Sequence, residues 1–309
     1  MDIRTYQQQH VAWDQFLAQS RNGAFFFKRG YMDYHADRFQ DASLWIEKEG
    51  QVLAMLPASR DGDTIVSHGG LSFGGLVMSA RLGAADVKAL FEQLRDYWAA
   101  MGIKKLIYKP IPHIYHSMPS EEDLYALFRL GARTMRVDVS TTIMQESRLR
   151  LSKGRKHALS KAAKAGVTIR KSDDYASCWQ ILTDNLQARH GTSPTHSLQE
   201  ISLLASRCPE ISLYMAYLHE QPIAGVVMFD FGRVAHTQYI APSQVAREVG
   251  AVDLLLETLI SEVYADKPYF NFGISTCHNG LSFNEGLCAQ KEMFGGRTTT
   301  LQWLEMDCI

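Results

Sequence analysis

Residues 234–296 combine a backbone pattern and side chains that could bind a phosphorylated ligand and act on it. Residues 234–240 have the β-branched and aromatic content of a strand, which we expect residues 241–243 to interrupt, because Pro242 has no N–H to donate. From Gly250 the apolar residues follow helical spacing. The N-terminus of such a helix exposes backbone N–H groups and the positive end of the helix dipole, which suits a phosphate or pyrophosphate. The pattern therefore favours a ligand-binding loop at 241–251 over a plain strand–helix connection.

Two side chains near this loop could take part in a transfer reaction. Lys291 could stabilise negative charge on an acyl carbonyl, a phosphate or a carboxylate. A surface lysine paired with Glu285 or Glu292 is the alternative. Tyr239 lies at the end of the expected strand and could act as a proton donor, although tyrosine is also common in strands for packing. His236 would point to the opposite face of a regular strand, so only a bulge could bring it beside Tyr239.

Cys277 and His278 could be a nucleophile and its base, but the side chains of consecutive residues in an extended chain point apart. A structural role for this pair is favoured. The other cysteines are scattered and show no CxxC spacing, so no metal site is predicted. Reduced thiols in a cytosol are the simplest interpretation.

The hydrophobic periodicity predicts an α+β fold with strands, helices and turns throughout the chain. Residues 25–27, Phe-Phe-Phe, are expected to form a short buried strand. The main expected strands are 44–48, 51–58, 64–67, 105–109, 136–143, 211–218 and 222–231. The main expected helices are 84–101, 121–130, 173–189 and 197–206.

The two halves of the chain resemble one another in order and spacing. EKEGQVLAMLPA aligns with YLHEQPIAGVVM, GAADVKALFEQL from Gly83 aligns with GAVDLLLETLI from Gly250, and KKLIYK aligns with PYFNFG. Each copy reads as antiparallel strands, a helix and a further strand. The repeat predicts two domains, 1–145 and 146–309.

A basic segment lies between these halves, with Lys and Arg but no Asp or Glu from Arg148 to Lys171. Helical spacing places Lys156 and Lys161 on one face of a surface helix. Because the whole chain has a formal net charge of −1, this local excess indicates a local anionic partner and not a protein that coats DNA. A merely solvated cationic face is the alternative.

The length and composition bound the class of protein. With 309 residues, 46% of them hydrophobic, the chain can bury a sizeable core and favours two globular domains. No apolar run approaches the ~20 residues that a membrane-spanning helix needs. The first residues lack the apolar core of a signal peptide. We therefore expect a cytoplasmic protein with no membrane span.

The chain resembles the GNAT acyltransferase superfamily, and in particular its tandem form, the Fem-type peptidoglycan-bridge aminoacyltransferases and FemAB-like proteins. Residues 247–251, REVGA, resemble the family's pyrophosphate loop Q/R-x-x-G-x-G/A, with Val252 in place of the final small residue. Residues 271–296 resemble the FemAB-like ending, in which a lysine, here Lys291, precedes an aromatic-glycine pair. The basic segment resembles the Arg- and Lys-rich helix before the second domain. The long coiled-coil insertion often found in members that use aminoacyl-tRNA has no counterpart here.

The resemblance implies two tandem GNAT-like domains with mixed, mostly antiparallel sheets flanked by helices. It implies an N-acyltransferase that moves an acyl group from acyl-CoA, as co-substrate and not as a tightly bound cofactor, to an anionic, amine-bearing acceptor such as a cell-envelope precursor or sugar nucleotide. The alternatives are an aminoacyl-tRNA-dependent peptidoglycan-bridge aminoacyltransferase and a non-catalytic binding protein with the GNAT fold.

Site residues follow from the resemblance and from the loops above. Lys291 and Tyr239 are the predicted catalytic residues. The predicted donor-binding residues, which would hold a pantetheine arm between strands 234–240 and 269–273, are Ile240, Ala241, Arg247, Glu248, Val249, Gly250, Ala251 and Asn271. The predicted acceptor-binding residues of the first domain are His68, Tyr108, Lys109, His113 and Arg38, with an aromatic-packed loop as the alternative. The predicted anion-binding residues are Arg155, Lys156 and Lys161.

Overall fold

A computed structural model describes the backbone of residues 1–309 and the side chains of residues 1–188 and 191–309. The chain divides into two compact units. Unit 1 comprises residues 1–139, 276–282 and 300–309, and unit 2 comprises residues 140–275 and 283–299. Each unit therefore draws on separate stretches of sequence, whereas the repeat had suggested a single boundary at residue 145.

Unit 1 contains strands of two sheets and the long helix α3 (Ala84–Ala100). One sheet has the order β1-β3-β4-β7, formed by Asp2–Thr5, Leu44–Lys48, Gln51–Leu56 and Val77–Met78. The other has the order β17-β8-β6-β5-β2, formed by the end of β17 (Arg297–Asp307), Lys105–Tyr108, Thr64–Val66, Ser59–Asp61 and Gln40–Asp41. Helix α3 buries its apolar stripe, Val87, Leu90, Phe91, Leu94 and Trp98, in the core of this unit.

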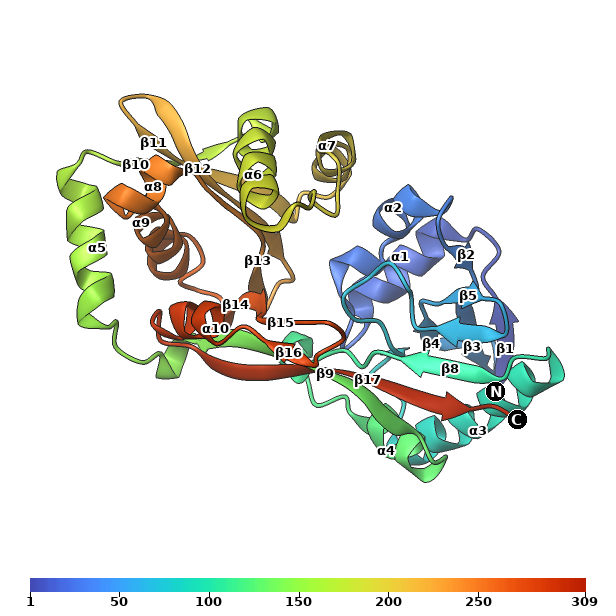
Figure 1. Cartoon of the computed structure of the whole chain (residues 1–309). Helices are drawn as coiled ribbons and strands as arrows, with labels where there is room; N and C mark the ends of the chain where they lie inside the picture. The colour runs from blue at the N-terminus through green and yellow to red at the C-terminus, as the bar shows by residue number, and fades with distance from the viewer. The chain divides into compact units, whose positions relative to one another are not determined.

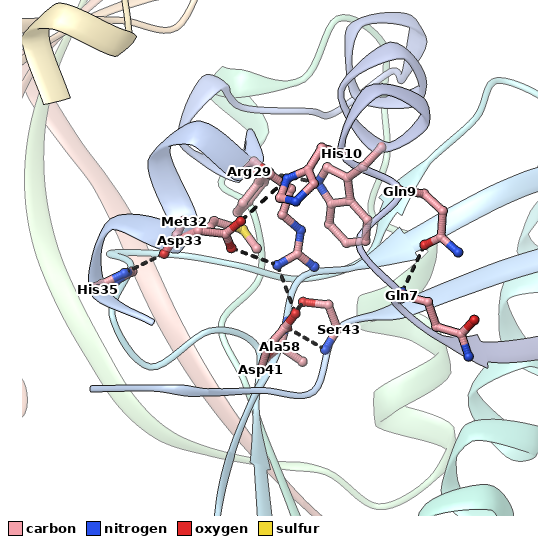
Figure 2. A network of polar contacts seen from close by, with 12 residues as sticks. Gln7, Gln9, His10, Arg29, Met32, Asp33, His35, Asp41, Ser43 and Ala58 are labelled. Atoms are coloured by element: carbon pink, nitrogen blue, oxygen red, sulfur yellow. Dashed lines mark hydrogen bonds and ion pairs between the residues drawn. The ribbon is translucent and has the colours of Figure 1, made fainter. Parts of the chain in front are cut away.

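A buried arginine joins the N-terminal segments of unit 1, α1 (His10–Gln19) and α2 (Arg29–Met32). Arg29 is 2% exposed, and its Nη1 donates to Asp41 at 2.9 Å and to Asp33 at 3.3 Å (Figure 2). Its guanidinium carbon lies 3.5 Å from the ring centroid of Tyr6 and 4.4 Å from that of Trp13. Two carboxylates and two aromatic faces thus offset the cost of removing this charge from water.

The strands of unit 2 follow one another in their sheet in the order β10-β11-β12-β13-β14-β9. Its strands are Thr168–Ser172, Ile211–Leu218, Gln221–Asp230, Val234–Pro242, Tyr269–Ile274 and the end of Arg133–Met144. All neighbours are antiparallel except β13 and β14. Figure 1 shows α5 (Lys153–Lys164) and α9 (Ala251–Thr258) on one side of β11–β13, with α6 (Tyr175–His190) and α7 (Leu198–Arg207) on the other.

Shorter helices complete the fold. Helix α8 (Gln244–Val249) precedes α9, a π-helical turn (Leu259–Val263) follows it, and α10 (Glu285–Glu292) carries Lys291. In unit 1, α4 (Glu122–Arg129) packs against α3. The remaining short elements are the 3-10 turns Phe25–Phe27, Asp33–His35, His113–Tyr115 and Gln145–Ser147, and the hairpin strands β15 (Thr276–Cys277) and β16 (Ser282–Phe283).

The α+β prediction is confirmed, and most expected strands and helices occur close to their expected bounds. Two expectations were wrong. Phe25–Phe27 form a buried 3-10 turn, not a strand. Strand β13 continues to Pro242, which pairs with Ala224 near the start of β12. The strand therefore includes residues 241 and 242, where the sequence had suggested an interruption, and ends at the proline.

Neither a bilayer-crossing helix nor a metal cluster is found where the structure describes the chain. No described helix combines the length and the apolar character that crossing a membrane would need. The described residues also contain no group of three or more His, Cys, Asp and Glu side chains placed to hold a metal ion.

Candidate functional site

The site of unit 2 begins where two parallel strands separate. Strands β13 and β14 pair only from Val234–Tyr269 to His236–Asn271. Strand β13 then continues to Pro242, while β14 shifts register against β9 between Asn271 and Ile274. The side chain of Asn271 stabilises this change of register, because its Oδ1 accepts a hydrogen bond from the N–H of Gly273 at 2.8 Å. Among the described residues, the edge of β13 beyond His236 therefore lacks a strand partner on its β14 side.

A cavity of about 640 Å³ lies beside this divergence, wholly within unit 2. Its walls come from α5, α6, α8, α9 and α10 and from the ends of β13 and β14. The lining is mostly apolar: Ala158, Ile240, Pro242, Val252, Leu256, Phe272, Leu287, Met293 and Phe294. Its polar and charged members are Arg155, Asn185, Arg247, Asp253, Gln290 and Lys291. This balance suits a mainly apolar ligand oriented by a few polar groups.

The N-terminus of α9 reaches the cavity through Val252 and Asp253. Gly250 ends α8 and precedes α9 with a φ of +78°, a conformation that glycine adopts readily. A Cβ on Gly250 would lie 2.7 Å from the carbonyl oxygen of Ala158, so α5 packs directly on this turn. The first-turn N–H groups of α9 have no partner within the helix. The predicted helix start at residues 249–251 is confirmed, whereas the sequence gave no sign of α8.

Lys291 lies at the cavity wall and is only 8% exposed. Its Nζ donates to the carbonyl oxygens of Ile274 at 2.7 Å and Gly273 at 3.0 Å. Burial lowers the pKa of this lysine to about 8. No ion pair to Lys291 occurs among the described residues, so the alternative of a surface lysine paired with Glu285 or Glu292 was wrong. An ammonium has three hydrogens, which leaves one for a ligand.

Tyr239 faces the other side of the sheet and does not line the cavity. Its hydroxyl lies 2.5 Å from Nδ1 of His196, and its ring packs edge-on against Trp179 of α6 at 5.1 Å. Burial raises the pKa of the Tyr239 hydroxyl. The structure therefore separates the two predicted catalytic residues, placing Lys291 in the cavity and Tyr239 beneath α6.

The other predicted donor residues divide in the same way. Ile240 and Arg247 line the cavity. Ala241 is fully buried, and Glu248 accepts a hydrogen bond from Gln244. Asn271 is 2% exposed and is not in the lining; its Nδ2 donates to Thr142 at 2.7 Å and to Ser140 at 2.9 Å. Val249, Gly250 and Ala251 shape the turn behind the lining.

The sequence did not single out several lining residues, chiefly Asn185, Leu256, Phe272 and Phe294. Phe272 could have been predicted from the sequence, because alternation along the expected strand places it on the same face as Phe270. The contributions of α6 and α10 depend on packing between distant segments, which no local pattern encodes.

The two faces of the basic helix α5 have different surroundings. Arg155 turns inward, forms an ion pair with Asp253 of α9, and donates to the carbonyl of Gln290 at 2.8 Å. Lys156 and Lys161 are exposed. The predicted outward stripe is therefore present, but Arg155 belongs to the cavity wall and not to that stripe.

The predicted acceptor residues of unit 1 are partly buried in its core. Tyr108 is fully buried, donates to Asp123 at 2.5 Å and accepts the N–H of Leu76 at 2.6 Å. Burial raises the pKa of Tyr108 well above its usual value and that of Asp123 to about 6. The hydroxyl of Tyr108 is thus committed to internal partners.

Lys109 and His68 are also buried. Lys109 is 1% exposed and donates to the carbonyls of His68 at 2.6 Å and Leu71 at 2.5 Å, above the ring of Trp303. Burial, followed by the charge of Arg136, lowers the pKa of Lys109 to about 7. His113 and Arg38 are exposed, and the Arg38 guanidinium lies 5.4 Å from the ring centroid of Tyr34. Their contact with an acceptor stays a prediction.

Cys277 and His278 lie in the β15–β16 hairpin of unit 1. The Cys277 sulfur is 3.6 Å from Nδ1 of His278, which also lies 2.9 Å from the hydroxyl of Ser282. The two side chains meet because His278 has a φ of +48°, so the expectation that they point apart was wrong. The described partner of His278 is a serine and not a carboxylate.

Comparison with known proteins agrees with the geometry of unit 2. Residues 145–278 match the family profile described as "Acetyltransferase (GNAT) domain". A search of curated protein sequences found no significant match.

Three solved structures are similar to the whole chain. The crystal structure of FemX has a TM-score of 0.68 at 12% identity, covering 99% of this chain and 97% of that one. L-PGS from Bacillus licheniformis has a TM-score of 0.64 at 14% identity, covering 98% and 93%. A tandem GNAT protein from the clavulanic acid biosynthesis pathway has a TM-score of 0.51 at 11% identity, covering 100% and 98%. Residues 145–278 thus have the fold of a GNAT domain, and the chain as a whole has the fold shared by FemX and the tandem GNAT protein.

Proposed function

We propose that this protein transfers an acyl group from acyl-CoA to an amine and that unit 2 holds the donor. One observation carries the proposal: an apolar cavity of about 640 Å³ lies where β13 and β14 part, with Lys291 in its wall. Apolar walls accommodate an extended donor arm, while the few polar groups orient its reacting end.

The strand divergence supports a donor that contains amides. The β14-facing edge of β13 beyond His236 has no strand partner among the described residues, so its backbone groups can pair with an extended ligand. The amides of a pantetheine arm have the required donors and acceptors. The first turn of α9 borders the same cavity and offers N–H groups and a positive dipole end to a diphosphate.

Lys291 supplies the electrostatic part of the reaction. When an amine attacks a thioester, negative charge develops on the carbonyl oxygen. Two hydrogens of the Lys291 ammonium are held by the carbonyls of Gly273 and Ile274, which fixes the direction of the third. A positioned, largely buried cation stabilises that oxygen more than a solvated lysine would.

The acceptor class is proposed from the fold neighbours and not from contacts. FemX and L-PGS share this fold, and a further neighbour from Agrobacterium fabrum is described as the C-terminal domain of a putative lysylphosphatidylglycerol synthetase. We propose an amine of a cell-envelope precursor or a sugar nucleotide as the acceptor.

An aminoacyl-tRNA is the second candidate donor, and the charge around α5 favours it. Arg148, Arg155 and Arg170 form ion pairs with acidic residues of unit 2. The other basic residues of the segment form no ion pair among the described residues: Arg150, Lys153, Lys156, Lys161, Lys164 and Lys171. An exposed row of cations beside the cavity suits a phosphate backbone.

Parallel titrations separate these donors. Acetyl-CoA and a mixture of aminoacyl-tRNAs are each titrated into the protein by calorimetry, with Leu256→Trp to fill the cavity and Lys156→Glu/Lys161→Glu to reverse the stripe. Binding of acetyl-CoA that Leu256→Trp abolishes supports the first proposal. Binding of tRNA alone, weakened by the charge reversal and by salt, supports the second. Absence of both would contradict transferase activity and favour a non-catalytic binding protein.

A further inference from the structure

A bulge in β13 brings a histidine to the face of the sheet opposite the cavity. Along β12, Val227 pairs with Tyr239 and Met228 pairs with Thr237, which leaves Gln238 as the extra residue. His236 pairs with Phe229, two residues from Val227, so His236 and Tyr239 share one face. The sequence indicated that only a bulge could bring His236 and Tyr239 to the same face, and β13 contains such a bulge.

The backbone of Gly273 is close to both His236 and Lys291. A Cβ on Gly273 would lie 3.4 Å from Cε1 and 3.8 Å from Nε2 of His236. The carbonyl of the same glycine accepts a hydrogen bond from Lys291. His236 and Lys291 therefore approach the point of strand divergence from its two sides.

The hydrogen bonds of Asn271 determine which nitrogen of His236 carries the proton. The Oδ1 of Asn271 accepts the backbone N–H of Gly273, which can only donate, and this fixes the orientation of the amide. The Nδ1 of His236 lies 2.7 Å from that same oxygen, so Nδ1 must be the donor. A neutral His236 consequently has its lone pair on Nε2, which has no hydrogen-bond partner among the described residues.

We propose that His236, through Nε2, is the general base of the transfer, and that the acceptor amine reaches the donor from the sheet face covered by α6 and α7. This inference rests on the proposed acyl transfer. Donor binding and proton removal then take place on opposite faces of the sheet. The donor lies in the cavity on the α9 side, and the proton leaves on the side of Tyr239.

The proposed step balances as follows. The neutral amine nitrogen forms a bond to the acyl carbon, and the carbonyl π pair moves to the oxygen beside Lys291. The nitrogen becomes acidic as this bond forms, and His236 takes one of its protons. The oxygen pair then re-forms the carbonyl and expels the CoA thiolate, which takes up a proton from water. His236 releases its proton to water, so an amide and a thiol result and the base is regenerated.

The surroundings of His236 keep its ring neutral at physiological pH. Burial lowers the pKa of this histidine to about 4, and the positive charge of Lys291 acts in the same direction, against the raising effect of the Asn271 hydrogen bond. The ring also lies edge-on to Phe231, with 6.2 Å between centroids. A base this weak accepts a proton only once the attacking nitrogen has begun to bond, which matches the step above.

The kinetic test uses acetyl-CoA and a panel of amino sugars and lysine peptides, with thiol release as the readout. His236→Gln retains an N–H donor for Asn271 but has no basic nitrogen, so kcat should fall by about 10²- to 10⁴-fold with little change in the KM for acetyl-CoA. Added imidazole should partly restore His236→Ala. His219→Gln, in the exposed β11–β12 turn, is the matched control and should keep wild-type rates. Unchanged kcat in His236→Gln would overturn the inference while leaving acyl transfer intact.

A second measurement is independent of turnover. Nitrogen NMR of the full-length protein labelled at histidine should show the His236 signal, assigned by its loss in His236→Gln, with the proton on Nδ1 from pH 8 down to about pH 5. A proton on Nε2 would overturn the inference whatever the activity. If wild-type protein transfers no acyl group, the proposed function fails and the base role fails with it.

Discussion

At the scale of single residues, the site depends on a buried cation held by backbone carbonyls. Lys291 could bury its ammonium only because Gly273 and Ile274 turn their carbonyls toward it. The φ of +71° at Gly273 makes this turn accessible to glycine and strained for other residues. The lowered pKa of about 8 means that Lys291 is mostly charged at neutral pH, at a cost of about 3 kcal/mol relative to an exposed lysine. A charge maintained at that cost is typical of a functional group.

Replacing Lys291 by methionine should reduce acyl transfer far more than donor binding. Methionine fills a similar volume but offers no hydrogen to the developing oxyanion, so we expect kcat to fall by about 10²- to 10³-fold. In the wild type, activity that depends on the ammonium should decline as the pH rises through about 8, because the folded-state pKa is lowered to that value. Steady-state kinetics between pH 6 and 9.5 measure both effects.

Lys88→Met serves as the control for this experiment. Lys88 lies in α3 and pairs with Glu92 four residues later, outside the described site. Its replacement should leave the rate and the pH profile unchanged. A Lys291→Met enzyme with wild-type kcat would remove Lys291 from the mechanism.

At the scale of elements, the close contact between α5 and the α8–α9 turn forms one wall of the cavity. Gly250 is required there twice, once for its φ of +78° and once for the 2.7 Å approach of the Ala158 carbonyl to its missing Cβ. Gly154, Arg155 and Ala158 of α5 line the cavity only while this contact holds. The Arg155–Asp253 ion pair joins the same two helices.

Gly250→Ala should lower the free energy of unfolding by about 2–4 kcal/mol, the sum of a left-handed residue with a Cβ and an overpacked contact. Gly232→Ala is the matched control, because Gly232 has a φ of +80° and no atom within 4 Å of the added Cβ. We expect about 1–2 kcal/mol there. Urea denaturation measures both, and equal losses would show that the α5 contact adds nothing.

Local patterns predicted the elements that position the site better than the site itself. Apolar spacing after Gly250 gave the start of α9, and β-branched content gave β13 and its neighbours. The β13 bulge and the short α8 were not predicted, since both depend on how the strand meets β12 and how the chain then turns. The structure places Lys291 and Ile240 in the cavity wall, whereas Tyr239 faces the other side of the sheet, because side chains of consecutive strand residues such as Tyr239 and Ile240 point to opposite faces.

At the scale of the whole molecule, the two units are interleaved in sequence. The last strand, β17, leaves unit 2 after Thr299 and ends in unit 1, where its residues Leu304 and Met306, and Cys308 just after it, join the core. Leu304 and Met306 pair with Tyr108 and Leu106 of β8. The internal repeat predicted two similar arrangements, and α3 and α9 do follow the aligned glycines. The repeat could not predict that β17 passes from one unit into the other, because no local sequence feature shows to which unit a strand belongs.

Because β17 passes from unit 2 into unit 1, we can predict which fragments of the chain fold on their own. Residues 1–145 lack Leu304 and Met306 of β17 and the Cys308 that follows it. Burying an apolar side chain of this kind is worth about 1.5–3 kcal/mol, and the sum is comparable with the ~5–15 kcal/mol stability of a typical domain. Residues 140–299 contain all of unit 2. We expect cooperative thermal unfolding by circular dichroism from 140–299 and none from 1–145. A cooperative transition in 1–145 matching that of 140–299 would contradict the interleaved organisation.

The central claim is that the unit 2 cavity holds the acyl donor with its carbonyl at Lys291. A crystal structure of the protein with a non-hydrolysable thioether analogue of acetyl-CoA tests this most directly. We predict electron density for the pantetheine arm between β13 and β14, with the carbonyl oxygen within hydrogen-bond distance of Lys291 Nζ. Density for the analogue elsewhere on the protein, or an unoccupied cavity at saturating analogue, would contradict the claim.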